Sequence, residues 1–187
     1  MGVMNGKVVL VTGGGRGVGR GIALEFARAG AAVVVNDLGV TLAGEAAQTS
    51  PAQDVVREIA ALGGRAIANS DSVASWDGAQ AMVQAAIDAF GRIDAVVNNA
   101  GNLRDSLFHK MTEEEFDAVL AVHLKGSFNV SRAAAPSGAA HDENRRTVRP
   151  IAVRCDRGRI RADGDVHRGR HRGLRRFHRR PVEQHLF

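Results

Sequence analysis

Three residue types are absent or scarce in this chain, and each scarcity narrows what the protein can do. No tyrosine occurs among the 187 residues, so the chain offers no phenol group for proton transfer. Cys155 is the only cysteine, which excludes a disulfide within the chain and argues against a cysteine-based metal site. Lysine occurs only as Lys7, Lys110 and Lys125, although lysine and arginine together number 25.

Long apolar runs are also missing. No stretch approaches the roughly 20 apolar residues that a membrane-spanning helix requires. The apolar run at 8–11 is too short for the core of a secretory signal and leads directly into glycines. We therefore expect no membrane partner and a cytoplasmic location.

The charges are distributed unevenly along the chain. Residues 1–137 contain 11 basic and 14 acidic residues, whereas residues 138–187 contain 14 arginines, no lysine and six acidic residues. The second region has almost no hydrophobic periodicity, so it would bury too little apolar surface to offset its ordering entropy. The sequence predicts one domain over 1–136, followed by a disordered Arg/His-rich tail over 137–187.

Strand and helix patterns alternate from residue 7 to about residue 136. The patterns predict strands at 7–12, 32–36, 65–68 and 93–97, a loop at 38–53, and helices at 17–29, 54–62, 76–90 and from 112 toward 136. Such alternation builds βαβ units, and these form a parallel sheet with helices on both faces. The predicted fold class is α/β, a Rossmann-type doubly wound parallel sheet, here truncated.

A glycine-rich segment, Thr12–Gly19, lies between the first strand and the first helix. Glycine allows a sharp turn and a close approach of backbone to a pyrophosphate, while the helix N-terminus offers unpaired N–H groups. A glycine run alone is more often a plain turn, but its position between a strand and a helix favours a dinucleotide loop. The predicted cofactor-binding residues here are Thr12, Gly13, Arg16, Gly17, Val18 and Gly19.

Asp37 ends the second predicted strand and bears on the choice of cofactor. A carboxylate there can accept hydrogen bonds from both ribose hydroxyls of NAD, but it would repel the 2′-phosphate of NADP. Two like charges about 4 Å apart cost roughly 4 kcal/mol at an effective dielectric near 20. Arg16 argues the other way, because a basic residue in the loop could bind that phosphate. We predict NAD, with NADP less favoured and a plain turn cap as the alternative role of Asp37.

Two motifs together carry a family resemblance. Thr12–Gly19, followed by Asn98-Asn99-Ala100-Gly101 after the fourth predicted strand, resembles the short-chain dehydrogenase/reductase family over about residues 5–136. The resemblance implies that Asn98, Ala100 and Gly101 support the sheet and line the cofactor. It also implies that Asp71 lies beside the adenine.

A closer resemblance concerns one subgroup of that family. Three segments are similar to the (3R)-hydroxyacyl-CoA dehydrogenase domain of the peroxisomal multifunctional enzyme and its bacterial relatives, namely 36–39, 99–105 and 122–128 (NDLG, NAGNLRD and VHLKGSF). This implies hydride transfer between NAD(H) and a secondary alcohol or ketone, with a 3-hydroxyacyl-CoA/3-oxoacyl-CoA pair as substrate. A 3-oxoacyl group on acyl carrier protein is the runner-up. The family is homo-oligomeric.

The family's catalytic residues are a serine, a tyrosine and a lysine, and they have no counterparts here. The chain has no tyrosine and no lysine after Lys125, and Ser137 comes before the strand that should carry the serine. Loss of one general acid–base group typically removes about 10²–10⁴ of the rate. His123 matches a position that is a catalytic asparagine in many members, but it could equally bond only to backbone. We expect an inactive chain, or alternatively a non-catalytic dinucleotide-binding module with a basic tail.

Three hypotheses compete for residues 137–187. An arginine-rich arm could bind nucleic acid phosphates, although only Phe177 interleaves the basic residues. A metal site could form among His167, His171 and His178, although the segment lacks helical patterning; we predict no metal. We favour a shifted reading frame, because codons for 141–143, 161–173 and the last residues can be chosen so that another frame encodes the family's serine strand and tyrosine.

Overall fold

The computed structural model describes residues 2–40 and 50–139, which all belong to one compact unit of the chain. Strands and helices alternate along it. The elements are β1 (Val8–Thr12), α1 (Gly17–Arg28), β2 (Ala32–Asn36), α2 (Pro51–Ala61), β3 (Arg65–Asn69), α3 (Trp76–Phe90), β4 (Ala95–Val97), the 3₁₀ turn η1 (Phe108–Lys110), α4 (Glu113–Leu120), the π-helix η2 (Ala121–Gly126) and α5 (Ser127–Ala139).

The four described strands form one parallel sheet in the order β3-β2-β1-β4. The register sets Thr12 opposite Asn36, and Asn36 opposite Asn69, so β1, β2 and β3 end in line. Val97, the last residue of β4, pairs with Val11, so β4 ends one residue short of the level of Thr12. This arrangement confirms the predicted Rossmann-type parallel α/β fold, and it gathers the segments that follow the four strands at one edge.

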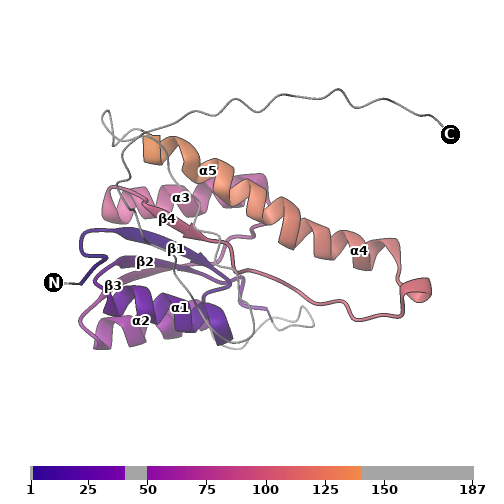
Figure 1. Cartoon of the computed structure of the whole chain (residues 1–187), viewed down its shortest axis with the longest axis horizontal. Helices are drawn as coiled ribbons and strands as arrows, with labels where there is room; N and C mark the ends of the chain where they lie inside the picture. Colours follow the sequence, from indigo (N-terminus) through magenta and orange to yellow (C-terminus); the bar gives the residue numbers. More distant parts are fainter. Residues whose placement is uncertain (1, 41–49, 140–187) are drawn as a thin grey trace, which may run out of the picture. The chain divides into compact units, whose positions relative to one another are not determined.

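The sheet divides the apolar interior into two clusters. In Figure 1, α1 and α2 lie on one side of the sheet, and α3 and α5 lie on the other. Val9 and Val11 point to the first side, where they pack with residues such as Ile22 and Ile59. Leu10 belongs to the second cluster, which also contains Met82, Val83, Ala86, Val130 and Ala134. Because both faces are covered, β1 and β2 are buried along their whole length.

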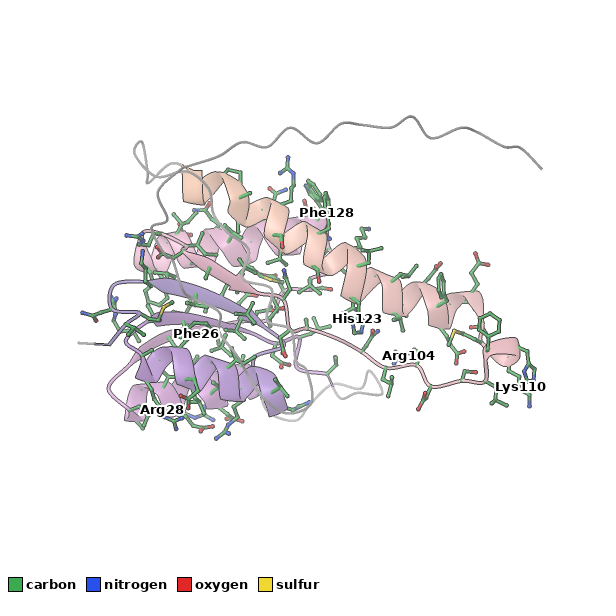
Figure 2. All side chains as sticks on the ribbon, viewed as in Figure 1. Phe26, Arg28, Arg104, Lys110, His123 and Phe128 are labelled. Carbon is green, nitrogen blue, oxygen red and sulfur yellow. The ribbon has the colours of Figure 1, made fainter. Side chains whose placement is uncertain are left out.

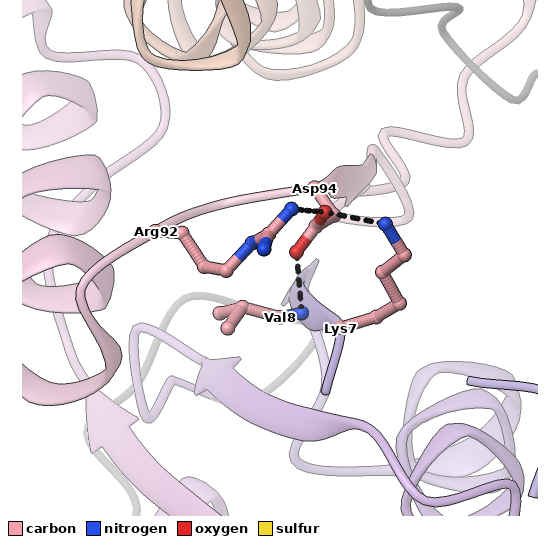
Figure 3. Close-up of polar contacts among 4 residues, drawn as sticks. All are labelled: Lys7, Val8, Arg92 and Asp94. Carbon is pink, nitrogen blue, oxygen red and sulfur yellow. Dashed lines mark hydrogen bonds and ion pairs between the residues drawn. The ribbon is translucent and has the colours of Figure 1, made fainter. Parts of the chain in front are cut away.

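A group of charges closes the amino ends of β1 and β4 (Figure 3). The Asp94 carboxylate accepts hydrogen bonds from Val8 N (2.9 Å), Lys7 Nζ (3.0 Å) and the Arg92 guanidinium (2.5 Å). The side chain of Asp94 is only 13% exposed. Burial alone would raise the pKa of Asp94, but the bonds from Val8, Arg92 and Lys7 outweigh it and hold this pKa below its ordinary value.

Among the four strands and the first three helices, two predicted boundaries differ from the structure by more than one residue. The helix predicted to begin at Asp54 begins at Pro51, because proline fits the first turn of a helix, where an N–H would have no intrahelical acceptor. Residues 51–53 therefore belong to the start of α2 and not to a loop, while residues 41–49 lie outside the described residues. The strand predicted at 93–97 is shorter, since Ile93 and Asp94 precede the ladder that pairs β4 with β1.

The helical region after Thr112 was predicted, but its buried face was not. Thr112 and Glu115 form a capping box at the start of α4. The helix passes through a π-turn and through Pro136 to Ala139. The apolar side chains that are spaced four apart along this region are all at least 37% exposed: Phe116, Leu120, Leu124 and Phe128. The packed face is carried by Val130 and Ala134 instead, which contact the α3 side of the core.

Two further sequence expectations concern larger parts of the chain. The predicted tail, 137–187, lies outside the described residues from residue 140 onward. Within 2–40 and 50–139, no helix has the length and apolar character needed to cross a bilayer.

Candidate functional site

The glycine-rich loop places bare backbone directly after β1. Gly13 and Gly17 adopt φ angles of 61° and 50°, which side-chain-bearing residues rarely adopt. Gly19 is required for a different reason, because a Cβ there would lie 2.0 Å from the carbonyl oxygen of Gly13. A Cβ on Gly13 would lie 2.9 Å from Cα of Ala100. The loop is therefore folded tightly on itself and against the segment that follows β4.

Helix α1 begins at this loop without a side-chain cap. Arg16 is the N-cap residue, and its side chain makes no capping hydrogen bond. The N–H groups of the first turn, at Gly17, Val18 and Gly19, consequently have no intrahelical acceptor, and the positive end of the helix dipole lies there. An added Cβ at Gly17 would meet no atom of residues 2–40 and 50–139 within 4 Å, so these residues leave the space above the turn open. Uncapped N–H groups, a positive dipole and open space fit a bound pyrophosphate.

Thr12 and Asn99 join the ends of β1 and β4. The buried hydroxyl of Thr12 donates to Val97 O (3.2 Å) and accepts from the backbone N–H groups of Asn99 and Ala100, both at 3.1 Å. The Asn99 amide nitrogen donates to the carbonyl oxygens of Thr12 and Gly13, each at 3.0 Å. Thr12 is only 1% exposed, so the structure places it beneath the loop as a support.

Asp37, after β2, is held by two backbone groups. Its Oδ2 accepts from Gly15 N (3.0 Å) and its Oδ1 accepts from Gly39 N (2.9 Å). A Cβ on Gly15 would lie 2.7 Å from Asp37 Oδ2, so the glycine lets the carboxylate approach the loop. Asp37 thus ties β2 to the glycine loop and presents a fixed negative charge beside it.

Asp71 lies at the end of β3 in a network of three side chains. Asn36, which is 2% exposed, donates from Nδ2 to Asn69 Oδ1 (2.8 Å) and to Asp71 O (2.9 Å). Asn69 in turn donates to the Asp71 carboxylate (2.7 Å), and Asp71 N donates back to Asn69 Oδ1 (3.0 Å). The two asparagines therefore fix the backbone and the carboxylate of Asp71 at the same sheet edge as Asp37.

The remaining predicted residues occupy different parts of the site. Arg16 is exposed and donates to Val40 O (3.0 Å), so its guanidinium reaches toward the segment after β2. Asn98 donates from Nδ2 to Ser131 Oγ of α5 (2.9 Å) and so points away from the glycine loop. Ala100 lies against Gly13, and a Cβ on Gly101 would lie 2.8 Å from Cε1 of His123. The structure brings most of the predicted residues together and sets Asn98 apart.

His123, on η2, bonds to backbone. Its Nε2 lies 2.9 Å from Asn102 O and 3.2 Å from Asn102 N. In Figure 2 the labelled His123 lies on the side of its helix that faces the segment leading to Arg104. Within the part of the chain that the structure describes, no group of three or more histidine, cysteine, aspartate or glutamate side chains is arranged to hold a metal ion.

Sequence reasoning passed over Asn99 and Asn69 as functional candidates. Asn99 lies inside the motif 98–101, but nothing in its spacing shows that its amide reaches back to Gly13. Asn69 is the last residue of β3 and stands opposite Asn36, the last of β2. A polar residue at the end of each strand is a signal that a parallel-sheet model could have used, because such residues meet at one edge.

Parallel strands that end together, with a glycine turn leading into an uncapped helix, are the architecture of the dinucleotide-binding class of α/β folds. Within that class the chain belongs to the short-chain dehydrogenase family, since the model of that family, described as short chain dehydrogenase, matches residues 7–145. This confirms the resemblance seen in the two sequence motifs.

Individual relatives agree with the family assignment. A short chain dehydrogenase from Mycobacterium avium, known from a crystal structure, is 55% identical with a TM-score of 0.67, over 73% of this chain and 48% of that one. The peroxisomal multifunctional enzyme type 2 of Mus musculus is 52% identical over 70% of this chain and 17% of its own length. A hydroxyacyl-CoA dehydrogenase of Mycobacterium tuberculosis is 43% identical over 71% and 40%, respectively. The chain therefore spans about half, or less, of the length of these relatives.

Proposed function

We propose that this chain binds NAD(H) at the carboxyl edge of its sheet and represents the cofactor-binding half of an oxidoreductase. The observation that carries the proposal is the uncapped N-terminus of α1 behind the glycine loop, with Asp37 fixed beside it. The helix end would hold the pyrophosphate, and the carboxylate would accept the ribose hydroxyls. When bound, the nicotinamide supplies hydride transfer; the residues described here bind and orient it.

NAD is favoured over NADP because Asp37 cannot move aside easily. Hydrogen bonds from Gly15 and Gly39 hold both of its carboxylate oxygens. A 2′-phosphate placed there would meet a fixed like charge, at the cost of roughly 4 kcal/mol at a 4 Å separation and an effective dielectric near 20. Arg16 offers a compensating charge, but it is exposed and its guanidinium already donates to Val40 O. Repulsion by Asp37 therefore outweighs attraction by Arg16.

The test is a pair of fluorescence titrations of the full chain with NADH and NADPH. We expect NADH to bind more tightly by about tenfold or more, a difference of 1.4 kcal/mol or more. Asp37→Asn should reduce the ratio of the NADPH to the NADH dissociation constant, because the negative charge is lost while an amide oxygen can still accept a hydrogen bond from Gly15 N. Arg16→Gln is the matched control in the same loop and should leave NADH as the preferred ligand. Equal affinities in the wild type would contradict the assignment of NAD, and no binding of either would contradict the function.

The substrate proposal rests on the relatives and on the subgroup resemblance. One relative is named a hydroxyacyl-CoA dehydrogenase, and the subgroup motifs at 36–39, 99–105 and 122–128 agree with that name. We propose a 3-hydroxyacyl-CoA/3-oxoacyl-CoA pair, with a 3-oxoacyl group on acyl carrier protein as the alternative. Homo-oligomers are the corresponding proposal for assembly.

We do not expect these 187 residues to catalyse the oxidation of a hydroxyacyl substrate. No tyrosine is present to exchange a proton with the substrate oxygen, and the last lysine is Lys125. We infer a chain that binds cofactor without oxidising hydroxyacyl-CoA, so NADH formation should stay at background in an assay that saturates NAD. The second candidate function, a non-catalytic dinucleotide-binding module with a basic tail, predicts the same result in this assay. The nucleotide sequence of the gene distinguishes this module from an oxidoreductase whose reading frame is shifted.

A shifted reading frame after about residue 137 is the hypothesis that accounts for the arginine-rich composition of the tail. Sequencing the gene across codons 134–187 and beyond tests it directly. A serine, a tyrosine and a lysine in family order in another frame would support the hypothesis, whereas an intact frame without them would favour the module. The cytoplasm remains the proposed location, with the peroxisome as the alternative compartment because one relative is named a peroxisomal enzyme. Imaging of the tagged chain distinguishes them.

A further inference from the structure

His123 occupies an unusual point in the helical region that follows η1. Helices α4 and α5 are ordinary α-helices, but the residues between them, Ala121–Gly126, form a π-turn. Such turns often occur at functional sites, because they rotate the side chains on either side relative to each other. The hydroxyl of Ser127 donates to His123 O (2.6 Å) and so satisfies a carbonyl of this turn.

The imidazole of His123 contacts the segment after β4 in two ways. Its Nε2 lies within hydrogen-bond distance of both backbone groups of Asn102, with 2.9 Å to the oxygen and 3.2 Å to the nitrogen. Its ring also fills the place of a side chain on Gly101, where an added Cβ would lie 2.8 Å from Cε1. Asn102 is held again by its own Nδ2, which donates to Ala118 O of α4 (3.0 Å).

These contacts continue, residue by residue, to the glycine loop. Gly101 is covalently joined to Ala100, whose Cα would lie 2.9 Å from a Cβ on Gly13. Asn99, which precedes Ala100, donates a hydrogen bond from Nδ2 to Gly13 O at 3.0 Å. The ring of His123, the backbone of 99–102 and the first glycine of the loop therefore form one continuous packed path. At both glycines of this path, Gly13 and Gly101, an added Cβ would lie less than 3.0 Å from a neighbouring atom.

We propose that His123 is a positioning residue that sets the distance between the 99–102 segment and the glycine loop, and thereby the affinity for NAD(H). The proposal rests on the proposed function for its effect on affinity, but its packing part does not. His123 acts through Asn102 and Gly101, and it is not assigned contact with the substrate.

The packing part is tested by a double-mutant cycle on the thermal midpoint of the full chain. Gly101→Ala should lower the midpoint clearly when His123 is present, because the new methyl group meets the ring. In a His123→Ala background the same change should cost much less, since the space is then free. Contacting residues show such coupling, whereas independent sites add. An equal effect of Gly101→Ala in both backgrounds overturns the proposal, whether or not the chain binds NADH.

The affinity part is tested by NADH titration of three variants. His123→Ala should weaken binding by about tenfold, the equivalent of one lost hydrogen bond to backbone. His123→Gln should restore most of the affinity, because a glutamine amide reaches about as far as Nε2 and can both donate and accept. His109→Ala is the control, since His109 is an exposed histidine on η1, outside the 99–102 segment.

Each outcome has a defined meaning. Rescue by glutamine, with no effect of the His109 change, supports a positioning role through the Asn102 backbone. Equal affinities of wild type and His123→Ala, or equal losses in the alanine and glutamine variants, overturn it. A wild type that binds no NADH refutes the proposed function and the affinity part together, and the cycle at Gly101 still decides the packing part.

Discussion

The two edges of the sheet use polar side chains in opposite ways. At the amino edge, Asp94 accepts hydrogen bonds from Lys7, Arg92 and the N–H of Val8, so its negative charge is compensated by two neighbouring cations. At the carboxyl edge, among residues 2–40 and 50–139, Asp37 accepts hydrogen bonds only from neutral backbone N–H groups, and the N-cap residue of α1 makes no side-chain capping bond. The polar groups of the amino edge stabilise the fold by pairing with one another. The carboxyl edge instead presents a carboxylate and uncapped N–H groups that a ligand can bind.

The difference shows why mutations at the two edges should have separable effects. Removing a charge at the amino edge leaves its former partners unpaired and should act on stability alone. Removing space at the carboxyl edge should act on ligand affinity as well as on stability, because the loop backbone itself is the binding surface. The predictions below test this separation, beginning with the largest expected effect.

Gly19→Ala should abolish NADH binding and destabilise the fold. The added Cβ would lie 2.0 Å from Gly13 O. Because this oxygen belongs to the backbone, it cannot avoid the clash by a change of rotamer. We expect a loss of about 3 kcal/mol or more in the free energy of unfolding, measured by urea denaturation. Gly21→Ala is the matched control in the same helix. Nothing lies within 4 Å of a Cβ there, so it should be neutral or stabilising by up to about 1 kcal/mol. Normal NADH affinity in Gly19→Ala would refute the loop assignment.

Asp94→Asn should lower stability without changing NADH affinity. The variant keeps the side-chain shape but loses the charge that pairs with Lys7 and Arg92. Hydrogen bonds to charged groups contribute about 1.5–3 kcal/mol, so we expect a loss of about 2 kcal/mol in the free energy of unfolding. Urea denaturation measures the stability, and titration at a temperature where both proteins are folded measures affinity. A large loss of affinity with unchanged stability would contradict the separation of the two edges.

The stability difference between wild type and Asp94→Asn should depend on pH in the acid range. The pKa of Asp94 is lowered on folding, so its contribution to stability is fully present above the unfolded pKa, about 3.9. The contribution is lost as the pH falls through the folded pKa. Urea denaturation at a series of pH values should therefore show a constant difference from pH 7 to about pH 5, and a shrinking one below about pH 4. A difference that grows on acidification would reverse the sign and exclude this linkage.

Glu58→Gln should have the smallest effect. Glu58 pairs with Arg20 across α1 and α2, and the hydrogen bond from Arg20 lowers the pKa of Glu58 below its ordinary value. Both side chains are at least 40% exposed, so solvent and salt screen the pair. We expect the thermal midpoint to change by no more than about 2 °C, measured by circular dichroism. If Glu58→Gln lowered the thermal midpoint as much as Asp94→Asn does, solvent exposure would not explain a difference in strength between the two ion pairs.

Much of the fold could be read from the sequence, because β1 and β2 are buried on both faces. Such strands appear as continuous runs of valine and similar residues, and their bounds are sharp where glycine or a polar residue follows. The glycine loop could be read for the same reason, since its position between strand and helix is local information. Asp37 was found because it directly follows β2.

The rest depends on contacts that no local pattern records. A helix was predicted from residue 112 onward, yet its packed face is the one that carries Val130 and Ala134. The side chains of Phe116, Leu120, Leu124 and Phe128 are exposed. The π-turn at 121–126 has no marker in residue type. The reach of Asn99 to Gly13 is equally invisible, because the two residues are far apart in sequence.

The division of the interior by the sheet has a consequence for how the molecule can come apart. One cluster packs against α1 and α2, and the other against α3 and α5, with the buried strands as a wall between them. Side chains on opposite faces of the wall share no partners, so truncations in the two layers should add. Each layer can then open as its own cooperative unit. Amide exchange should record two distinct opening free energies, one for each pair of helices.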